Sequence, residues 1–233
     1  MPLLQFKQLS DQALFVQFSM TINEQTQQQI QQAIAFLQKQ PFPGLIEIVP
    51  GYTNFCVYYD PFIVHKSLQR NTKKTSADKV AQYIKNLLED RQQALPLDGR
   101  LIEIPVLYGG EYGPDLNEVA NINGLTPAEV IEIHTSKHYL VHMLGFAPGF
   151  PFLGGMDQRI ATPRRKTPRL EIAAGSVGIA GEQTGIYPLA TPGGWQIIGR
   201  TTTPLFLPDQ NPPTLLLAGD RIRFVAVKEE TLC

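Results

Sequence analysis

Glycine is distributed very unevenly along this chain. Only two of its 19 glycines precede Gly99, whereas the region 109–199 is dense in glycine and proline. A region poor in glycine can sustain long regular elements, while one rich in glycine and proline is broken into short elements by turns. The change near Gly99 therefore predicts an N-terminal domain at 1–92, a linker at 93–99 and a C-terminal domain at 100–233.

The first region predicts a small sheet covered by two helices, in the order β-β-α-β-β-α. Thr21 and Glu24 have the spacing of a capping box, with Thr21 as N-cap, and an apolar stripe with helical spacing follows until Pro41. A second helix is expected from Ser76. Apolar and β-branched runs predict strands at 14–18, 45–49 and 54–59.

The second region predicts a small β-barrel after one strand and two short helices. The strand is expected at 100–108, and the second helix is marked by a capping box from Thr126 to Glu129 with Pro127 at its first position. Short apolar stretches separated by turn residues then predict strands at 139–144, 170–173, 177–180, 186–189, 196–198, 204–207 and 221–227. The expected fold class is α+β, an N-terminal α/β sandwich followed by a β-barrel.

Composition and charge exclude several function classes. A formal net charge of −1 argues against a nucleic-acid partner, and no apolar run reaches the roughly 20 residues that span a bilayer. Two cysteines are too few for a disulfide framework, so a cytoplasmic location is expected. The sequence has neither a Gly-Lys phosphate loop nor a dinucleotide fingerprint, so a nucleotide is not expected to bind to this chain alone.

The stretch 145–155, GFAPGFPFLGG, is too apolar for a solvated loop and too rich in glycine and proline for a regular element. It therefore predicts a packed, rigid loop, the kind of segment that presents binding groups. We expect its aromatic side chains to contact a partner protein: Phe146, Phe150 and Phe152.

A basic segment follows this loop. Its cations outnumber the neighbouring acids Asp157 and Glu171, and they are Arg159, Arg164, Arg165, Lys166 and Arg169. Pro163 and Pro168 bracket Arg164 and Arg165 on a stiff segment, which suits bidentate capture of a carboxylate or phosphate. The interpretation that we favour is an oxyanion clamp, and a solvated basic loop is the alternative.

Two further sets of side chains are candidate site residues. Gln183, Tyr187 and Trp195 offer amide, phenol and indole groups that suit a small amide-containing or ring-shaped molecule, although Trp195 also fits a core position. Among ionisable groups, His134 and Glu182 are the candidates for a general base. His134, His138 and His142 recur every four residues, but a strand pattern interrupts the helix that a zinc site would need, so no metal is predicted.

Four blocks of this region resemble the family of 5-oxoprolinase B subunits, also called the KipI-like or allophanate hydrolase subunit 1 family. This family is related to the carboxyltransferase domain, subdomains C and D, of urea carboxylase. The first block is the 145–155 loop, and the others are PRRKTPR at 163–169, AGSVGIAG from residue 174 and PGGWQIIGRT from residue 192. Phe152 stands where the family often has Tyr, which puts a substrate contact of that hydroxyl in doubt.

The resemblance implies a cyclophilin-like C-terminal barrel and a subunit that does not act alone. In the similar systems, the B subunit pairs with the C subunit, which is a second barrel protein, and with the A subunit. Their assembly uses ATP to open 5-oxoproline to L-glutamate. On that basis, Arg164, Arg165 and His134 are expected to be catalytic. The expected substrate-binding residues are Arg169, Gln183, Tyr187 and Trp195.

Two alternatives from other functional classes stay open at this point. Some relatives inhibit the autophosphorylation of a sporulation histidine kinase, and the 145–155 loop would then be the contact surface. Others are components of allophanate hydrolase or urea carboxyltransferase, which act on a urea-derived amide.

Overall fold

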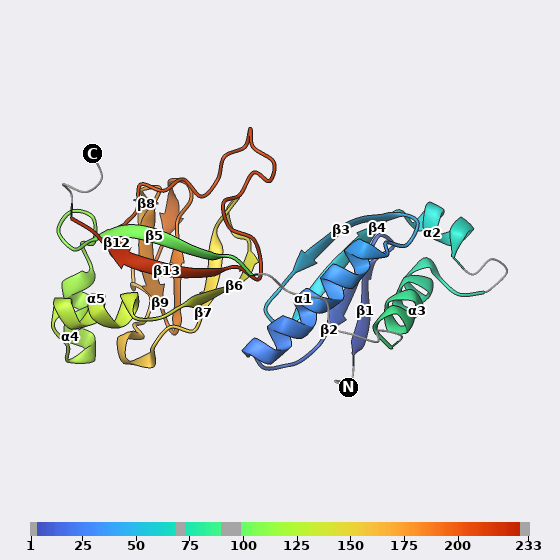
Figure 1. Ribbon diagram of the computed structural model, residues 1–233, viewed down its shortest axis with the longest axis horizontal. Coiled ribbons are helices and arrows are strands. Elements are labelled where there is room, and N and C mark those ends of the chain that lie inside the picture. The colour runs from blue at the N-terminus through green and yellow to red at the C-terminus, as the bar shows by residue number, and fades with distance from the viewer. Residues whose placement is uncertain (1–3, 69–72, 90–98, 229–233) are drawn as a thin grey trace. The chain divides into compact units, whose positions relative to one another are not determined.

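The computed structural model describes residues 4–68, 73–89 and 99–228 (Figure 1). The chain divides into two compact units, Met1–Asp98 and Gly99–Cys233. All of the predicted linker 93–99 except Gly99 lies outside the described residues. No helix in the described ranges has the length and apolarity needed to cross a membrane.

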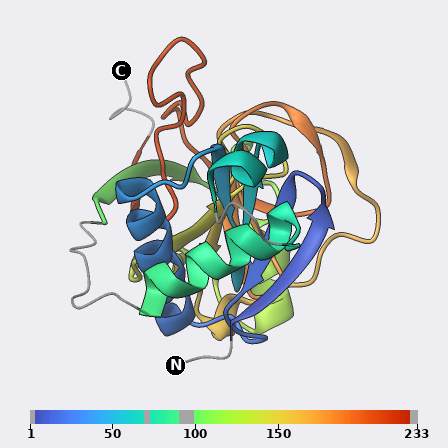
Figure 2. The ribbon, with the colours of Figure 1, turned by 90° about the vertical axis from the view of Figure 1, so that its right-hand side faces the viewer.

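The first unit contains a four-stranded antiparallel sheet in the order β1-β2-β4-β3. The strands are β1 (Gln5–Ser10), β2 (Ala13–Gln17), β3 (Leu45–Pro50) and β4 (Asn54–Tyr59). Three helices accompany it, α1 (Glu24–Lys39), α2 (Pro61–Ser67) and α3 (Ser76–Glu89). Figure 2 shows α1 and α3 side by side.

One face of this sheet forms the core of the first unit. Alternate residues of a strand point to the same face, and here Leu14 and Val16 of β2 and Val57 of β4 are buried against the apolar stripes of α1 and α3. The predicted α/β layer is therefore confirmed. Its helices differ from the prediction in two respects.

The N-cap of α1 is Asn23 and not Thr21, so that prediction is wrong. The Asn23 side chain accepts a hydrogen bond from the main-chain N–H of Thr26 at 2.7 Å, whereas Thr21 lies before the helix. Asn is as good an N-cap as Thr, and the apolar stripe does not distinguish them. The short helix α2 was not predicted; it begins at Pro61 after Asp60, whose carboxylate caps it.

The second unit is a closed barrel in the order β10-β7-β6-β13-β5-β12-β9. Its neighbouring strands are antiparallel except β5 and β13, which run parallel. The strands are β5 (Leu101–Tyr108), β6 (Tyr139–Leu144), β7 (Pro151–Gly154), β9 (Ser176–Ala180), β10 (Gln183–Ile186), β12 (Gln196–Arg200) and β13 (Arg221–Ala226). A separate two-stranded sheet joins β8 (Arg169–Ile172) to β11 (Thr191–Gly193).

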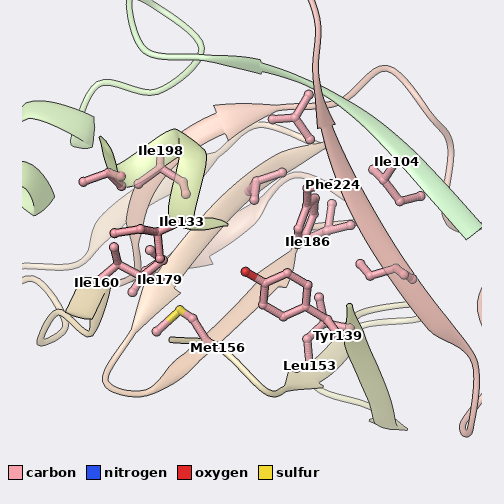
Figure 3. Close-up of a cluster of buried hydrophobic side chains, with 14 of the residues drawn as sticks. Ile104, Ile133, Tyr139, Leu153, Met156, Ile160, Ile179, Ile186, Ile198 and Phe224 are labelled. Carbon is pink, nitrogen blue, oxygen red and sulfur yellow. The ribbon is translucent and has the colours of Figure 1, made fainter. Parts of the chain in front are cut away.

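Apolar side chains fill the barrel. Tyr139 and Phe224 are among these side chains in Figure 3, and their ring centres are 5.2 Å apart with an angle of 68° between the ring planes. Helices α4 (Leu116–Asn123) and α5 (Pro127–Thr135) and the 3₁₀ turn η1 (Gln158–Ile160) add buried residues to the same cluster. The capping box predicted at the start of α5 is present, with both of its hydrogen bonds.

Three predictions for the second region need correction, and one strand is additional to them. The stretch 145–155 is a rigid loop only in its first half, because β7 pairs with β6 and β10. The strand predicted at 186–189 is instead 183–186, since Pro188 cannot donate to a strand ladder. The stretch 204–207 contributes only an isolated bridge from Phe206 to Thr214, and β11 was not predicted.

Candidate functional site

Main-chain hydrogen bonds hold the basic segment 163–169 against the barrel. Immediately before it, Thr162 and Gly181 form an antiparallel bridge with N–O distances of 3.1 and 2.7 Å. Within it, the main-chain N–H of Arg165 donates to the carbonyl oxygen of Gly194 at 2.8 Å. The arginines therefore extend from a fixed backbone, which disfavours the alternative of a freely solvated loop.

Beneath this segment lies a buried carboxylate, that of Asp115, with 5% of its side chain exposed. Arg165 donates to it through Nη1 at 2.8 Å, and Arg169 donates through both Nη atoms, each at 2.8 Å. The main-chain N–H of Ile197 donates to Oδ2 at 2.6 Å. This hydrogen bonding raises the pKa of Arg169 above its ordinary value, so its guanidinium group is firmly cationic.

Sequence reasoning did not find Asp115. It stands 50 residues before Arg165, at the N-cap position of α4, so a count of charges around the basic segment leaves it out. The available signal was an acidic residue that follows the glycine-rich stretch 109–113 and Pro114, next to the first predicted helix of the second region. That signal alone does not indicate a partner.

Arg164 differs from its two neighbours. Its side chain is exposed, and its guanidinium carbon lies 6.0 Å from the centre of the Trp195 ring. Within the ranges that the structure describes, Arg164 makes no ion pair. We call Arg164, Arg165 and Arg169 the arginine cluster: two of its members are anchored on Asp115, and the third is available to an anion.

Beside it lies an aromatic cluster formed by Phe146, Phe150, Phe152, Tyr187 and Trp195. Phe150 is its centre, with ring-centre distances of 5.5 Å to Trp195, 5.3 Å to Tyr187 and 5.0 Å to Phe152. Most of these pairs are close to perpendicular, the favourable arrangement for aromatic rings. Phe150, Tyr187 and Trp195 are buried, so this cluster is a rigid wall.

The hydroxyl of Tyr187 connects the two clusters. Burial raises the pKa of Tyr187, while the charges of Arg164 and Arg169 and the main-chain N–H of Trp195 act in the opposite direction. A Cβ atom on Gly193 would come within 2.5 Å of this hydroxyl, so glycine leaves the space that the phenol occupies. The structure thus brings together five of the predicted site residues, Arg164, Arg165, Arg169, Tyr187 and Trp195.

Phe146 is the exposed member of the aromatic cluster, with 70% of its surface accessible. Its φ is +65°, and the N–H of Ala147 donates to the carbonyl of Gly145 at 2.7 Å, which makes Phe146 the centre of a three-residue turn. A left-handed backbone is costly for a bulky residue. The second half of the loop turns at Gly149, which has a φ of +80°.

His134 lies away from both clusters, inside the barrel, and is fully buried. Its Nδ1 is 2.7 Å from the hydroxyl of Tyr108 and its Nε2 is 3.0 Å from that of Thr184. Burial lowers the pKa of His134 to about 3, so the imidazole is neutral near pH 7. This environment suits a structural role, and the catalytic role of His134 stays a prediction.

The remaining candidates lie at the turn between β9 and β10. Gln183 is half-buried and begins β10 opposite Ala180, and Glu182 is exposed in the turn itself. The substrate contact of Gln183 and the role of Glu182 as a base both stay predictions. Among the described residues, no group of three or more His, Cys, Asp or Glu side chains is arranged to hold a metal ion.

Comparisons with known proteins agree with this architecture. Residues 4–216 match the family model for the carboxyltransferase domain, subdomain C and D. The chain is 51% identical over 226 residues to the B subunit of 5-oxoprolinase from Bacillus subtilis, covering 97% of this chain and 94% of that protein. It is 46% identical over 187 residues to the B subunit of 5-oxoprolinase from Escherichia coli O157:H7, covering 80% of each.

A solved structure has the same fold. The crystal structure of TTHA0988 superposes with a TM-score of 0.76 and 35% identity over 93% of this chain, which spans only 40% of that longer chain. The resemblance seen in the sequence blocks is therefore confirmed over most of the chain. By its sequence and its fold, the chain belongs to the 5-oxoprolinase B-subunit family of carboxyltransferase-domain proteins.

Proposed function

We propose that this chain is the B subunit of a complex that uses ATP to open 5-oxoproline to L-glutamate, with an active site shared with a second barrel subunit. The names of its relatives support the reaction. The structural observation that supports an active site here is the arginine cluster, which is anchored on Asp115 and lies beside the buried Tyr187 and Trp195. It offers cationic donors next to a rigid aromatic wall, which suits an anionic ring-shaped substrate.

The chemistry requires such donors. A lactam resists hydrolysis, so transfer of the γ-phosphoryl group of ATP to its oxygen would make the ring carbon open to attack by water. Cleavage of the C–N bond sends its electron pair and a proton to the nitrogen, and hydrolysis of the phosphorylated carboxyl releases phosphate. The sum is 5-oxoproline, ATP and two waters giving L-glutamate, ADP and phosphate. Negative charge develops on oxygen atoms throughout, and guanidinium groups stabilise it.

Each group of this chain has a distinct task in the proposal. Arg164 and Arg165 contact the phosphoryl or carboxylate oxygens, and Arg169 holds the substrate carboxylate. The Tyr187 hydroxyl and the Gln183 amide orient the lactam, and Trp195 is the wall against which its ring lies. None of these groups is an evident base, and the two candidate bases of this chain, the buried His134 and Glu182, belong to neither cluster. We therefore assign the proton transfer to a partner chain of the complex.

ATP is a substrate that we expect to bind outside this chain. The sequence has no phosphate-binding loop, and the arginine cluster provides contacts to phosphate oxygens but none to a base or ribose. We therefore propose that the A and C subunits of 5-oxoprolinase complete the site in the cytoplasm. The exposed Phe146, at a strained position beside the aromatic cluster, is the side chain that we expect to contact the second barrel.

The test is ATP-dependent release of glutamate from 5-oxoproline by this chain, alone and co-expressed with the A and C subunits. We expect activity only in the full assembly and its loss in an R164A/R165A double variant that still assembles. Arg223→Ala is the matched control, because Arg223 is a barrel arginine whose exposed ion pair with Glu103 lies outside both clusters. A stable, complete complex that releases no glutamate would contradict the proposal, and ammonia released from allophanate or inhibition of a histidine kinase would replace it.

A further inference from the structure

Asp115 is the carboxylate to which both Arg165 and Arg169 are bound. We propose that it is a positioning residue, which locks Arg165 and Arg169 in place for an anionic oxygen of the substrate and leaves Arg164 to close on it. This inference rests on the proposed function for the identity of the substrate. The recognition of an anion by the arginine cluster can be tested separately.

The carboxylate is itself held in place by β12. Its Oδ2 accepts the main-chain N–H of Ile197 at 2.6 Å, and the N–H of Asp115 donates back to the carbonyl of Ile197 at 2.9 Å. Ile197 follows Trp195 by two residues in the chain. The position of the carboxylate relative to the indole ring is thus set by a short piece of backbone.

The carboxylate then fixes the two guanidinium groups. Arg169 donates end-on with both Nη atoms, which sets the plane of its guanidinium, and Arg165 donates with Nη1 alone. Together with Ile197, these donors give each oxygen of Asp115 two hydrogen bonds. A buried carboxylate is tolerated only with such compensation, and removing it leaves two cations without a fixed counter-charge.

Arg165 keeps donors for a ligand while it is bound to Asp115. A guanidinium has five N–H donors, and the contact with Asp115 uses one of them. The Nε atom of Arg165 is buried and has no hydrogen-bond partner among the described residues. Arg165 can therefore contact Asp115 and a carboxylate or phosphate oxygen simultaneously.

For the D115N variant, an argument from net charge and an argument from position predict opposite changes in anion affinity. Asp115 removes one of the three positive charges of the arginine cluster, so D115N should bind an anion more tightly if only net charge matters. If position matters, D115N should bind an anion more weakly despite the added charge. D115E separates the two further, because it keeps the charge and moves the carboxylate by one methylene group.

The experiment combines binding and kinetics on three forms of this chain, wild type, D115N and D115E. Inorganic phosphate is titrated against the fluorescence of Trp195, the single tryptophan of the chain, and kcat and KM for 5-oxoproline are measured in the assembled complex. We expect both variants to bind phosphate at least about tenfold more weakly and to lose about 10- to 100-fold in kcat, with no fall in KM. Asp157→Asn is the control, because Asp157 pairs with Arg159 and Lys137 away from the arginine cluster.

The outcomes are distinguishable. Tighter phosphate binding by D115N, or wild-type kcat and binding in D115E, would overturn the positioning role. If D115N fails to assemble, D115E decides the question. If the wild-type complex releases no glutamate, the proposed function fails, and the phosphate titration alone still tests the role of Asp115.

Discussion

The hydroxyl of Tyr108 lies 2.7 Å from Nδ1 of His134, whose imidazole ring is fully buried. On the other side of the ring, the Thr184 hydroxyl donates its hydrogen to the carbonyl of Gly178 at 3.0 Å. Thr184 can therefore only accept from His134, so the ring carries its proton on Nε2. Nδ1 then accepts from Tyr108, and all the polar atoms of this group are satisfied without a charge.

The buried His134 should make stability depend on pH. Its pKa is lowered by burial to about 3 in the folded chain, against an ordinary value of 6.5, so the unfolded chain binds the extra proton as pH falls below 6.5. The contribution is fully present above pH 6.5 and is lost toward pH 3. From pH 7 to pH 5, we expect about 2 kcal/mol less free energy of unfolding from this group.

Urea unfolding of wild type and His134→Gln at both pH values measures that contribution. Exposed carboxylates titrate equally in the two proteins, so the difference between their pH dependences belongs to His134. Equal dependences would mean that the imidazole is already protonated or accessible in the folded chain.

Two glycines with left-handed backbone offer a matched test of local packing. A Cβ atom at Gly175, where φ is +81°, would lie 2.0 Å from the carbonyl oxygen of Thr201, whereas one at Gly181, where φ is +61°, meets nothing within 4 Å. We expect Gly181→Ala to cost about 1 kcal/mol from backbone strain alone and Gly175→Ala clearly more. Thermal unfolding of the two variants checks the order, and equal losses would contradict the steric argument.

Alanine variants of Arg164 and Arg165 should differ in their effects on stability, although both should lower activity. Arg164→Ala removes an exposed side chain, so we expect its free energy of unfolding to stay within about 0.5 kcal/mol of wild type while kcat/KM falls about 10- to 100-fold. Arg165→Ala removes a donor from the buried Asp115 and should also lower stability by about 1–2 kcal/mol. Steady-state kinetics of the complex and denaturant titration of the chain measure the two effects, and equal stability losses would argue against the difference in anchoring.

The strained backbone at Phe146 should be relieved by glycine. Phe146→Gly is expected to leave the free energy of unfolding unchanged or to raise it by up to about 1 kcal/mol, because glycine adopts positive φ without strain. Association with the second barrel protein should weaken at the same time. Analytical ultracentrifugation of the two proteins measures the association, with Leu170→Ala, another exposed apolar residue, as the control. Unchanged association would remove Phe146 from the interface.

Features encoded in adjacent residues could be predicted from the sequence. The capping box at Thr126 and the strand at 139–144 depend on local spacing alone, and both are present. The apolar pattern predicts a strand at 186–189, whereas the strand at 183–186 contains the polar residue Thr184. In the structure its hydroxyl is satisfied by Gly178 and His134, so a polar residue fits inside the barrel.

The arrangement of the candidate site could be predicted from the sequence only in part. The residues of the arginine cluster and the aromatic cluster all lie within 145–201, so the local composition of this region indicates them. Asp115 approaches them only because the segment before α4 is pinned to β12, where Asp115 pairs with Ile197, which is 82 residues later. No local pattern encodes a contact over that distance.

The parallel pairing of β5 with β13 sets the order in which the second unit can form during synthesis. Glu103 and Arg223 are partners across this pair and are 120 residues apart. The ribosome must therefore synthesise nearly the whole second unit before β13 can pair with β5 and close the barrel. Until then, the main-chain hydrogen-bonding groups on one edge of β5 have no strand partner. The sheet of the first unit draws its strands only from residues 5–59, so it can be complete while the barrel is still an open ribbon. Nascent chains stalled before β13 should accordingly be the species that chaperones bind.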